Sequence, residues 1–221
     1  MKPYTGRSDE TKNMAMNEIL NSLYKTAPGT HIIVVYPHFA ALKQIYAHYI
    51  QRQLTNSEIV LILSYYETVE GIKKFLQDFE NGDGEMINID KCLREGSLLI
   101  VDSSKAFFNH NTTLKYYDES NSHNDSNNEN IVSLTKVLKL HSKKLNKHEI
   151  TILVDLGCFF DVSHGVEYLL KYENSVPQMF KNMNLKQFCF YYQKDFEKKF
   201  SISEKAELLD RHGRTVLMLD N

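Results

Sequence analysis

No tryptophan occurs in the 221-residue sequence, cysteine occurs only three times, and long apolar runs are missing. The longest are short segments such as residues 32–35, far below the roughly 18 residues that cross a bilayer, so no membrane partner is expected. Cys92, Cys158 and Cys189 form no CxxC pair, which argues against a zinc ribbon and a disulfide framework. The first residues lack the apolar segment of a signal peptide, so we expect a cytoplasmic protein.

An excess of charge of either sign is also missing. The chain has 26 Lys and Arg against 28 Asp and Glu, which gives a formal net charge of −2. Because proteins that grip nucleic acid through its phosphates carry a strong basic surface, a nucleic-acid partner is disfavoured. The hydrophobic fraction of 42% is enough for a sizeable core, so the chain is not mainly disordered.

What the sequence does contain is an alternation of apolar segments with amphipathic segments. Strands are expected at 31–36, 58–65, 97–101, 150–155, 185–192 and, as a last edge strand, 215–219. Helices are expected at 39–53, 69–79, 131–145, 166–172 and 201–211. Continuous apolar strands that alternate with helices predict an α/β protein, a three-layer sandwich around a mostly parallel central sheet.

Two segments stand outside this alternation. Residues 1–28 are expected to contain an amphipathic helix at about 9–25, which packs on the α/β domain of residues 29–221 or docks a partner. Residues 117–130 are expected to form a mobile loop, because 118–130 contains only Asp, Glu, Ser, Asn and His. A tolerated insertion is favoured there over a lid.

Polar and aromatic side chains follow every predicted inner strand. In parallel sheets the ligand site lies beyond the carboxyl ends of the strands, so these side chains are candidates for binding a small molecule. A bland alternative is that strand ends are polar because they meet water. The candidates at these ends are Tyr36, His38, Tyr65, Glu67, Asp102, Asp155, Cys158 and Tyr191.

A nucleotide is the first ligand to test at such an edge. A phosphate-binding turn needs glycines, a lysine and a hydroxyl, but the turn at 36–41 has no glycine and contains Pro37, which lacks a backbone N–H. ATP hydrolysis of the usual kind is therefore disfavoured. A nucleotide-binding protein or weak ATPase with a non-standard loop stays open as an alternative, with Lys43, Asp102 or Asp155 as its residues.

Other catalytic patterns are equally thin, so the chain is not expected to be an enzyme. It has no GxSxG turn, and nothing shows that Cys158 and His164 meet; a buried, inert cysteine is the commoner state. The nine histidines show no HxxxH or HxxEH spacing, so neither a metal site nor a cofactor is expected.

Six short segments carry motifs in a fixed order, at 29–36, 49–54, 57–61, 93–98, 169–174 and 187–196. They include a Gly-x-His that leads an apolar strand into Tyr, a Leu-x-x-Tyr-Glu helix and a Cys-x-Tyr strand. Together they resemble the MEDS family, a group of sensory domains named for methanogen and methylotroph regulators. The resemblance covers about 29–221. It departs from the family where 155–158 replaces a Met-x-Trp, where Pro177 is expected to interrupt a helix, and at the insert 118–130.

The resemblance implies a RecA/KaiC-like fold that has lost its phosphate loop, and a role in sensing small, hydrocarbon-derived molecules. The residues that it singles out are His31, Tyr36, Tyr172, Glu173 and Cys189. His31 also has a structural interpretation, because a histidine at the start of a strand can serve as a cap at the opposite edge from the pocket.

The leading hypothesis is therefore a non-enzymatic cytosolic sensory or signalling domain that binds a small, mostly apolar molecule or a partner protein. No kinase, receiver or helix-turn-helix segment is evident, so the output is expected to pass through a signalling partner, and a homo-oligomer is a further expectation. The other alternative is a protein-interaction module without a ligand.

Overall fold

The computed structural model describes residues 10–56, 58–79, 87–108, 143, 149–179, 184–212 and 215–219. Seven strands form one sheet in the order β1-β7-β2-β6-β5-β3-β4, and every neighbouring pair is parallel. The strands are β1 (Glu10–Met14), β2 (His31–Tyr36), β3 (Ile59–Ser64), β4 (Leu98–Asp102), β5 (Ile150–Asp155), β6 (Leu185–Tyr192) and β7 (Thr215–Leu219). The α/β class and the mostly parallel sheet expected from the sequence are confirmed.

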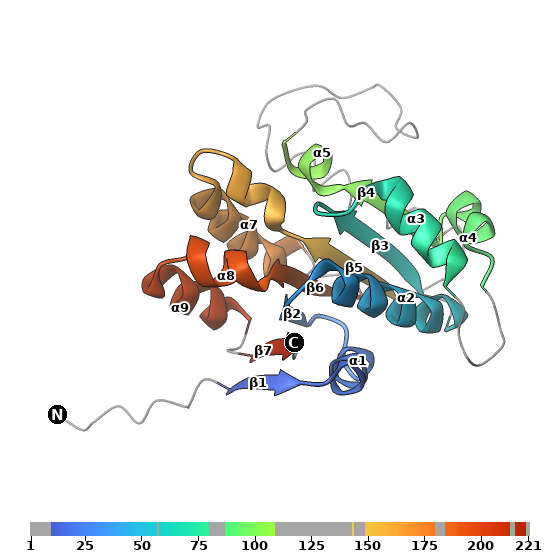
Figure 1. The fold of residues 1–221 in the computed structure, drawn as a ribbon, viewed down its shortest axis with the longest axis horizontal. Helices are drawn as coiled ribbons and strands as arrows, with labels where there is room; N and C mark the ends of the chain where they lie inside the picture. Colours follow the sequence, from blue (N-terminus) through green and yellow to red (C-terminus); the bar gives the residue numbers. More distant parts are fainter. Residues whose placement is uncertain are drawn as a thin grey trace.

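Helices cover both faces of the sheet (Figure 1) and make it the middle of three layers. The first face is covered by α1 (Met16–Tyr24), α2 (Phe39–Thr55), α3 (Val69–Asp78) and α4 (Ile89–Glu95). The second face is covered by α5 (Ser103–Phe108), the 3-10 helix η1 (Gly157–Asp161), α7 (Gly165–Met179), α8 (Gln193–Lys199) and α9 (Ile202–Arg211).

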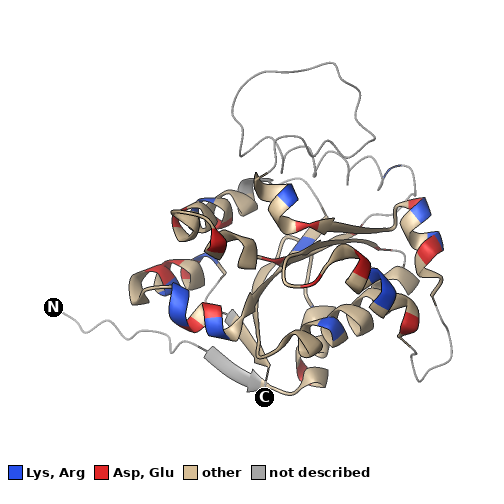
Figure 2. Cartoon of the chain, turned by 45° about the horizontal axis from the view of Figure 1, so that its top comes forward, with Lys and Arg blue, Asp and Glu red and all other residues tan. Residues whose placement is uncertain are grey.

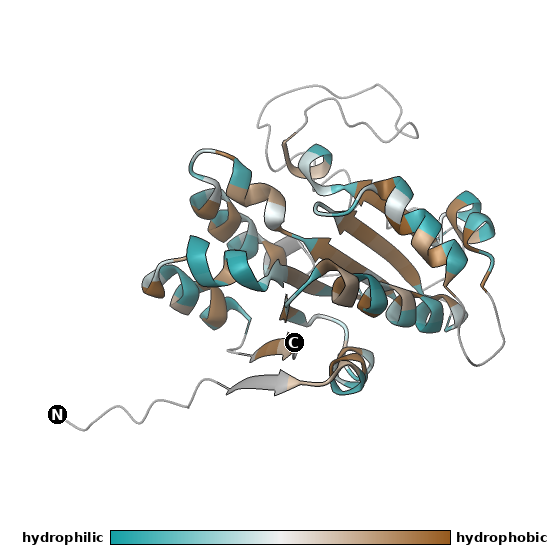
Figure 3. Ribbon diagram, in the orientation of Figure 1, coloured by the Kyte–Doolittle hydropathy of each residue, from teal (hydrophilic) through white to brown (hydrophobic). Residues whose placement is uncertain are grey.

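The central strands are apolar on both faces because both faces are covered. Every residue of β3 and of β5 is buried, and the inner strands, which run through the middle of the molecule, consist mainly of hydrophobic residues (Figure 3). Lys, Arg, Asp and Glu lie mainly on the helices (Figure 2), whose outer sides face water. No described helix has the length and apolar character needed to cross a bilayer.

The N-terminal segment differs from its prediction. Instead of one helix over about 9–25, the chain forms β1 and then the shorter α1. Contacts between Ala15 and Glu18 begin this helix. β1 pairs with β7, so β1 is the edge strand and β7, expected at the edge, lies between β1 and β2. The residues of β1 are not apolar enough to show as a buried strand, which is why the sequence did not reveal it.

Three further predictions are corrected in detail. α7 continues through Pro177 instead of stopping before it. Residues 91–96, expected as a turn, belong largely to α4, which Asn88 caps and Gly96 ends in a left-handed conformation at φ 79°. α8 was not predicted at all. The polar segment 117–130 and the helix expected at 131–145 lie outside the described residues, except for Lys143.

Candidate functional site

The twelve candidate residues divide into two groups at different places. One group lies at the carboxyl ends of the strands: Tyr36, His38, Tyr65, Glu67, Asp102, Asp155 and Cys158. The other group lies between the second face of the sheet and the helices α7 and α9: His31, Tyr172, Glu173, Cys189 and Tyr191.

Asp155 is the most deeply buried acid of the strand-end group, and its carboxylate is held by backbone groups. Its Oδ1 accepts from the N–H of Gly157 at 3.1 Å and its Oδ2 from the N–H of Tyr66 at 3.3 Å. Burial raises the pKa of Asp155 to about 7, although these two hydrogen bonds lower it. A side chain at Gly157 would collide with the Tyr66 ring, its Cβ lying 2.4 Å from Cε2, so glycine is needed in this turn. Asp155 thus stabilises the loops at its strand end.

The remaining polar residues of this group serve local turns and helix starts. His38 caps α2 by accepting from the N–H of Ala41 at 3.1 Å, and Asp102 accepts from that of Lys105 at 3.0 Å at the start of α5. Tyr65 donates to the carboxylate of Asp161. These contacts match the alternative interpretation, in which the strand ends are polar for structural reasons and bind no ligand.

The residues of the nucleotide-binding alternative are engaged in the same way. Lys43 forms an ion pair with Glu67 at 3.1 Å. Of the other candidates at the strand ends, Cys158 is buried, and burial raises the pKa of its thiol, which disfavours the reactive thiolate. Tyr36 is fully buried and stacks on Tyr192. No described residue of this group offers a free cation toward a phosphate at Asp155.

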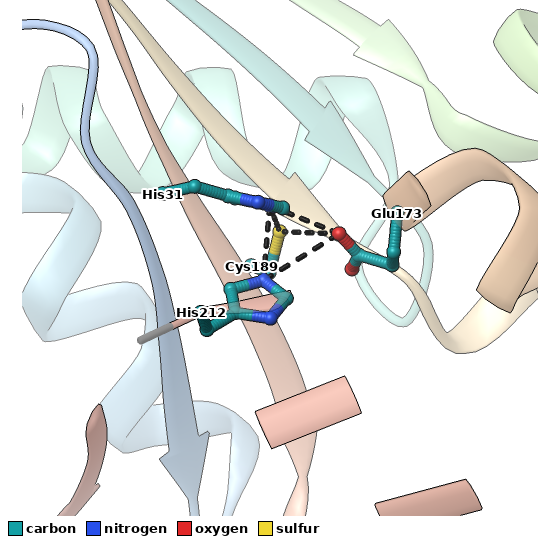
Figure 4. A group of neighbouring side chains, drawn as sticks. All are labelled: His31, Glu173, Cys189 and His212. Carbon is teal, nitrogen blue, oxygen red and sulfur yellow. Dashed lines mark hydrogen bonds and ion pairs between the residues drawn. The ribbon is translucent and has the colours of Figure 1, made fainter. Parts of the chain in front are cut away.

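Three members of the second group, His31, Glu173 and Cys189, converge on one point with a further residue, His212 (Figure 4). One donor atom from each of His31, Glu173, Cys189 and His212 lies within 4.8 Å of every other. His31 Nε2 is 2.9 Å from Glu173 Oε2, 2.9 Å from Cys189 Sγ and 3.0 Å from His212 Nε2. The side chains of Glu173 and His212 are fully buried, and that of His31 is 9% exposed.

Each of these side chains comes from a different element. His31 begins β2. Cys189 lies on β6, where alternate residues share one face of the sheet, so that Gln187, Cys189 and Tyr191 face the same helices. Glu173 lies on the buried side of α7, in the same stripe as Leu169 and Val176 at helical spacing. His212 is the C-cap of α9, directly before β7.

The electrostatics of this cluster keep Glu173 ionised. Burial alone would raise the pKa of Glu173, but the charges and hydrogen bonds of His31 and His212 outweigh it, so the pKa lies well below its usual range. Burial lowers the pKa of His31 more than Glu173 raises it. The pKa of the Cys189 thiol is raised by burial and then by the Glu173 carboxylate. The cluster is therefore a buried carboxylate that faces two imidazoles and a thiol.

A second layer of hydrogen bonds fixes these side chains. Tyr191 donates to Glu173 Oε1 at 2.8 Å, which leaves Oε2 directed at the histidines. Tyr172 donates to Gln187 Oε1 at 3.1 Å, and the amide nitrogen of Gln187 then reaches Cys189 Sγ at 3.1 Å. His212 Nδ1 bonds to the carbonyl of Leu208 at 2.8 Å.

Sequence reasoning missed His212 and Gln187. His31 and His212 are 181 residues apart in the chain, so a search for closely spaced histidines, on which the expectation of no metal site rested, does not detect the pair. Gln187 opposes His31 in the register of β2 and β6, which the sequence does not reveal. The local sign of a buried polar site in this region was an acid, Glu173, within the apolar stripe of a helix.

Comparisons with known proteins bear on the fold. No family model matches the chain, and no curated protein matches it either. A KaiC-like protein, PH0186 of Pyrococcus horikoshii, is 15% identical with a TM-score of 0.47 over 75% of this chain; this chain spans 62% of that protein. PH0321 of Pyrococcus horikoshii, an uncharacterized protein whose structure is in complex with an unknown peptide, is 16% identical with a TM-score of 0.59; the match covers 93% of this chain and 84% of PH0321. The similarity to PH0321 concerns the fold alone.

Proposed function

We propose that the protein is a non-enzymatic sensory or signalling domain, as the MEDS resemblance implies, and that its ligand acts on the buried His31–Glu173–Cys189–His212 cluster. The observation that supports this proposal is the convergence of four donor side chains from β2, α7, β6 and α9 within 4.8 Å. Such a polar group in a sheet-and-helix interface adds nothing to packing and is unfavourable unless something compensates it.

The small, mostly apolar ligand expected at the strand ends has less support. The polar side chains there are engaged in caps and turns, and Asp155 is satisfied by two backbone N–H groups. The same contacts speak against the nucleotide-binding alternative. A partner protein receives the signal in this proposal, and a protein-interaction module without a ligand is the outcome to separate from it.

The connection from the cluster to the surface runs through His212. This residue follows α9 directly and precedes β7, and β7 carries the edge strand β1. A ligand held by His212 would therefore favour the docked position of the whole edge, which is the kind of two-state element that a sensor needs.

Thermal melting and hydrogen exchange test the proposal. The chain is titrated with divalent metal ions, small apolar molecules and ATP with Mg²⁺, and the exchange of the backbone amides in β7 and α1 is followed. We expect one ligand to raise the melting temperature and slow exchange in β7, and Glu173→Gln to remove both effects. Stabilisation by ATP that Asp155→Asn abolishes would support the nucleotide alternative instead. Unchanged exchange with every ligand would overturn the sensory proposal and leave the interaction module.

A further inference from the structure

We propose that the cluster binds one divalent transition-metal ion of the zinc class, with His31 Nε2, Glu173 Oε2, Cys189 Sγ and His212 Nε2 as its four ligands. The inference rests on the proposed function for where the signal acts, and it names the chemical class of that ligand. It is argued below from distances, proton counting, charge and the surrounding hydrogen bonds.

The distances between the donor atoms are those of a small coordination shell. Zinc bonds of about 2.0–2.3 Å in a tetrahedron place the ligand atoms about 3.3–3.8 Å apart. Here His31 Nε2 is 2.9 Å from Cys189 Sγ and 3.0 Å from His212 Nε2. Glu173 Oε2 lies 3.5 Å from His212 Nε2 and 3.8 Å from Cys189 Sγ. These separations lie below or within the tetrahedral range, and all pairs of donor atoms lie within 4.8 Å, so shifts of up to about an ångström complete the shell.

Counting protons shows that His31 alone cannot serve both acceptors that it faces; the other donor directed at Glu173 Oε2 is the Cys189 thiol, at the long distance of 3.8 Å. A carbonyl oxygen only accepts, so His212 Nδ1 must donate to Leu208, and a neutral His212 then presents a lone pair at Nε2. Glu173 Oε2 also presents lone pairs. His31 Nε2 faces both of them and can supply at most one proton. A cation among these atoms accepts all the lone pairs at once.

The charge of Glu173 points in the same direction. Another buried acid of the chain, Glu58, is neutralised in the ordinary way, by Lys186 at 2.9 Å with Thr151 as a further donor. Among the described residues, the ion pairs of Glu173 involve only His31 and His212, with no lysine or arginine. A metal ion supplies a permanent positive charge at a place where the described residues provide only titratable imidazoles.

The outer hydrogen bonds are those that orient metal ligands. Ligating histidines usually donate their other ring N–H to a carbonyl or carboxylate, as His212 does to Leu208. Tyr191 holds the far oxygen of Glu173, and Gln187 donates to Cys189 Sγ. The inner shell is thus prepared from outside on three of its four members.

The donor set selects the ion. Two imidazoles, one thiol and one carboxylate suit zinc and its neighbours and do not suit magnesium or calcium, which prefer oxygen ligands only. Four buried protein ligands leave no open position for water, which is typical of structural or regulatory zinc and not of a hydrolytic centre. Binding requires the Cys189 thiolate, so uptake of the ion releases the thiol proton to solvent.

Cobalt substitution tests the site directly. The full-length chain is stripped with a chelator and titrated with Co²⁺ at neutral pH, and bound metal is counted by mass spectrometry. We expect one ion per chain, the strong visible bands of tetrahedral Co²⁺ and a near-ultraviolet thiolate-to-metal band. Cys189→Ser should remove the near-ultraviolet band, and His212→Gln and Glu173→Gln should each weaken binding at least tenfold. The matched controls Cys92→Ser and His164→Gln, at residues outside the cluster, should leave the spectrum unchanged.

Two results would overturn the metal site: less than a tenth of an ion per wild-type chain, or an unchanged spectrum in Cys189→Ser. Because wild-type stoichiometry is decisive, a variant that fails to fold does not weaken the test. A Glu173-dependent response to some other ligand, without bound metal, would sink this inference and keep the proposed function. Stoichiometric metal binding with unchanged amide exchange in β7 would support the metal site and overturn the proposed function.

Discussion

Asp155 and Glu173 are both completely buried carboxylates on the same domain, yet their surroundings differ in kind. Two backbone N–H groups hold Asp155 at a strand end, whereas the side chains of His31, His212, Cys189 and Tyr191 surround Glu173. Burial raises the pKa of Asp155 to about 7, while the histidines lower the pKa of Glu173 despite its burial.

This difference separates two uses of a buried acid. An acid held by the backbone fixes the path of nearby loops and leaves nothing directed at a ligand. An acid held by side chains that also have lone pairs forms with them a set of donor atoms that a cation can occupy. In this fold the usual ligand edge, at the carboxyl ends of the strands, has the first kind, and the interface of the sheet with α7 and α9 has the second.

Metal removal should give the largest effect and break the comparison most clearly. With Zn²⁺ at a thousandfold excess over its Kd, the wild-type protein should gain about 4 kcal/mol of unfolding free energy relative to the chelated protein. Urea denaturation with and without chelator measures this gain. Glu173→Gln should lower this gain by at least about 1.4 kcal/mol, as a tenfold or greater loss of affinity requires, and Asp155→Asn should retain it. Equal loss of the gain in both variants would refute the distinction.

The pH dependence of stability should report Asp155 next. Its pKa is about 7 in the folded protein against an ordinary value of 3.8 in the unfolded chain, so between these values the folded state binds more protons. Stability from this group is therefore present at low pH and falls as pH rises, by about 2–3 kcal/mol between pH 5 and 8. Urea denaturation of chelated protein across this range should show the fall, and Asp155→Asn should flatten it. The same slope in both proteins would contradict the prediction.

Tyrosine hydroxyls in the two regions should differ in a smaller way. Tyr191→Phe removes the hydrogen bond to Glu173 Oε1 and should weaken metal binding about 10–100-fold, the usual loss for an outer partner of a ligand. Tyr36→Phe changes an equally buried tyrosine of the strand-end group and should leave metal affinity unaltered. Competition against a colorimetric chelator measures both. Similar affinities for the two variants would remove Tyr191 from the site.

The two regions also show what the sequence could reveal. Apolar, β-branched runs bounded by helical periodicity predicted the inner strands closely, as β2 and β5 show, because burial on both faces acts on each strand separately. The polar residues at the strand ends were also visible, because each apolar run stops there. Their roles as caps depend on distances across loops, as Asp155 with Tyr66 shows, and these are not local.

The cluster could be predicted only in part. The resemblance singled out His31, Tyr172, Glu173 and Cys189, and the strand-end pattern singled out Tyr191, but neither showed that these residues meet. Their meeting with His212 depends on the parallel register of β2 with β6 and on the packing of α9 against α7. Such contacts arise from tertiary packing, which no spacing in the chain encodes.

The smallest effect concerns how firmly His212 is held, and it has a matched control in the other half of the fold. Ser201 caps α9, its hydroxyl accepting from the N–H of Glu204 at 3.3 Å; Thr68 caps α3, accepting from that of Gly71 at 2.9 Å. Replacing either cap by alanine should lower the free energy of unfolding by about 1 kcal/mol. Only Ser201→Ala should also weaken metal binding, by a few-fold, because fraying of α9 frees His212 at its end. Urea denaturation and chelator competition measure the two quantities. A loss of affinity in Thr68→Ala as large as in Ser201→Ala would mean that global stability, and not the position of α9, controls the site.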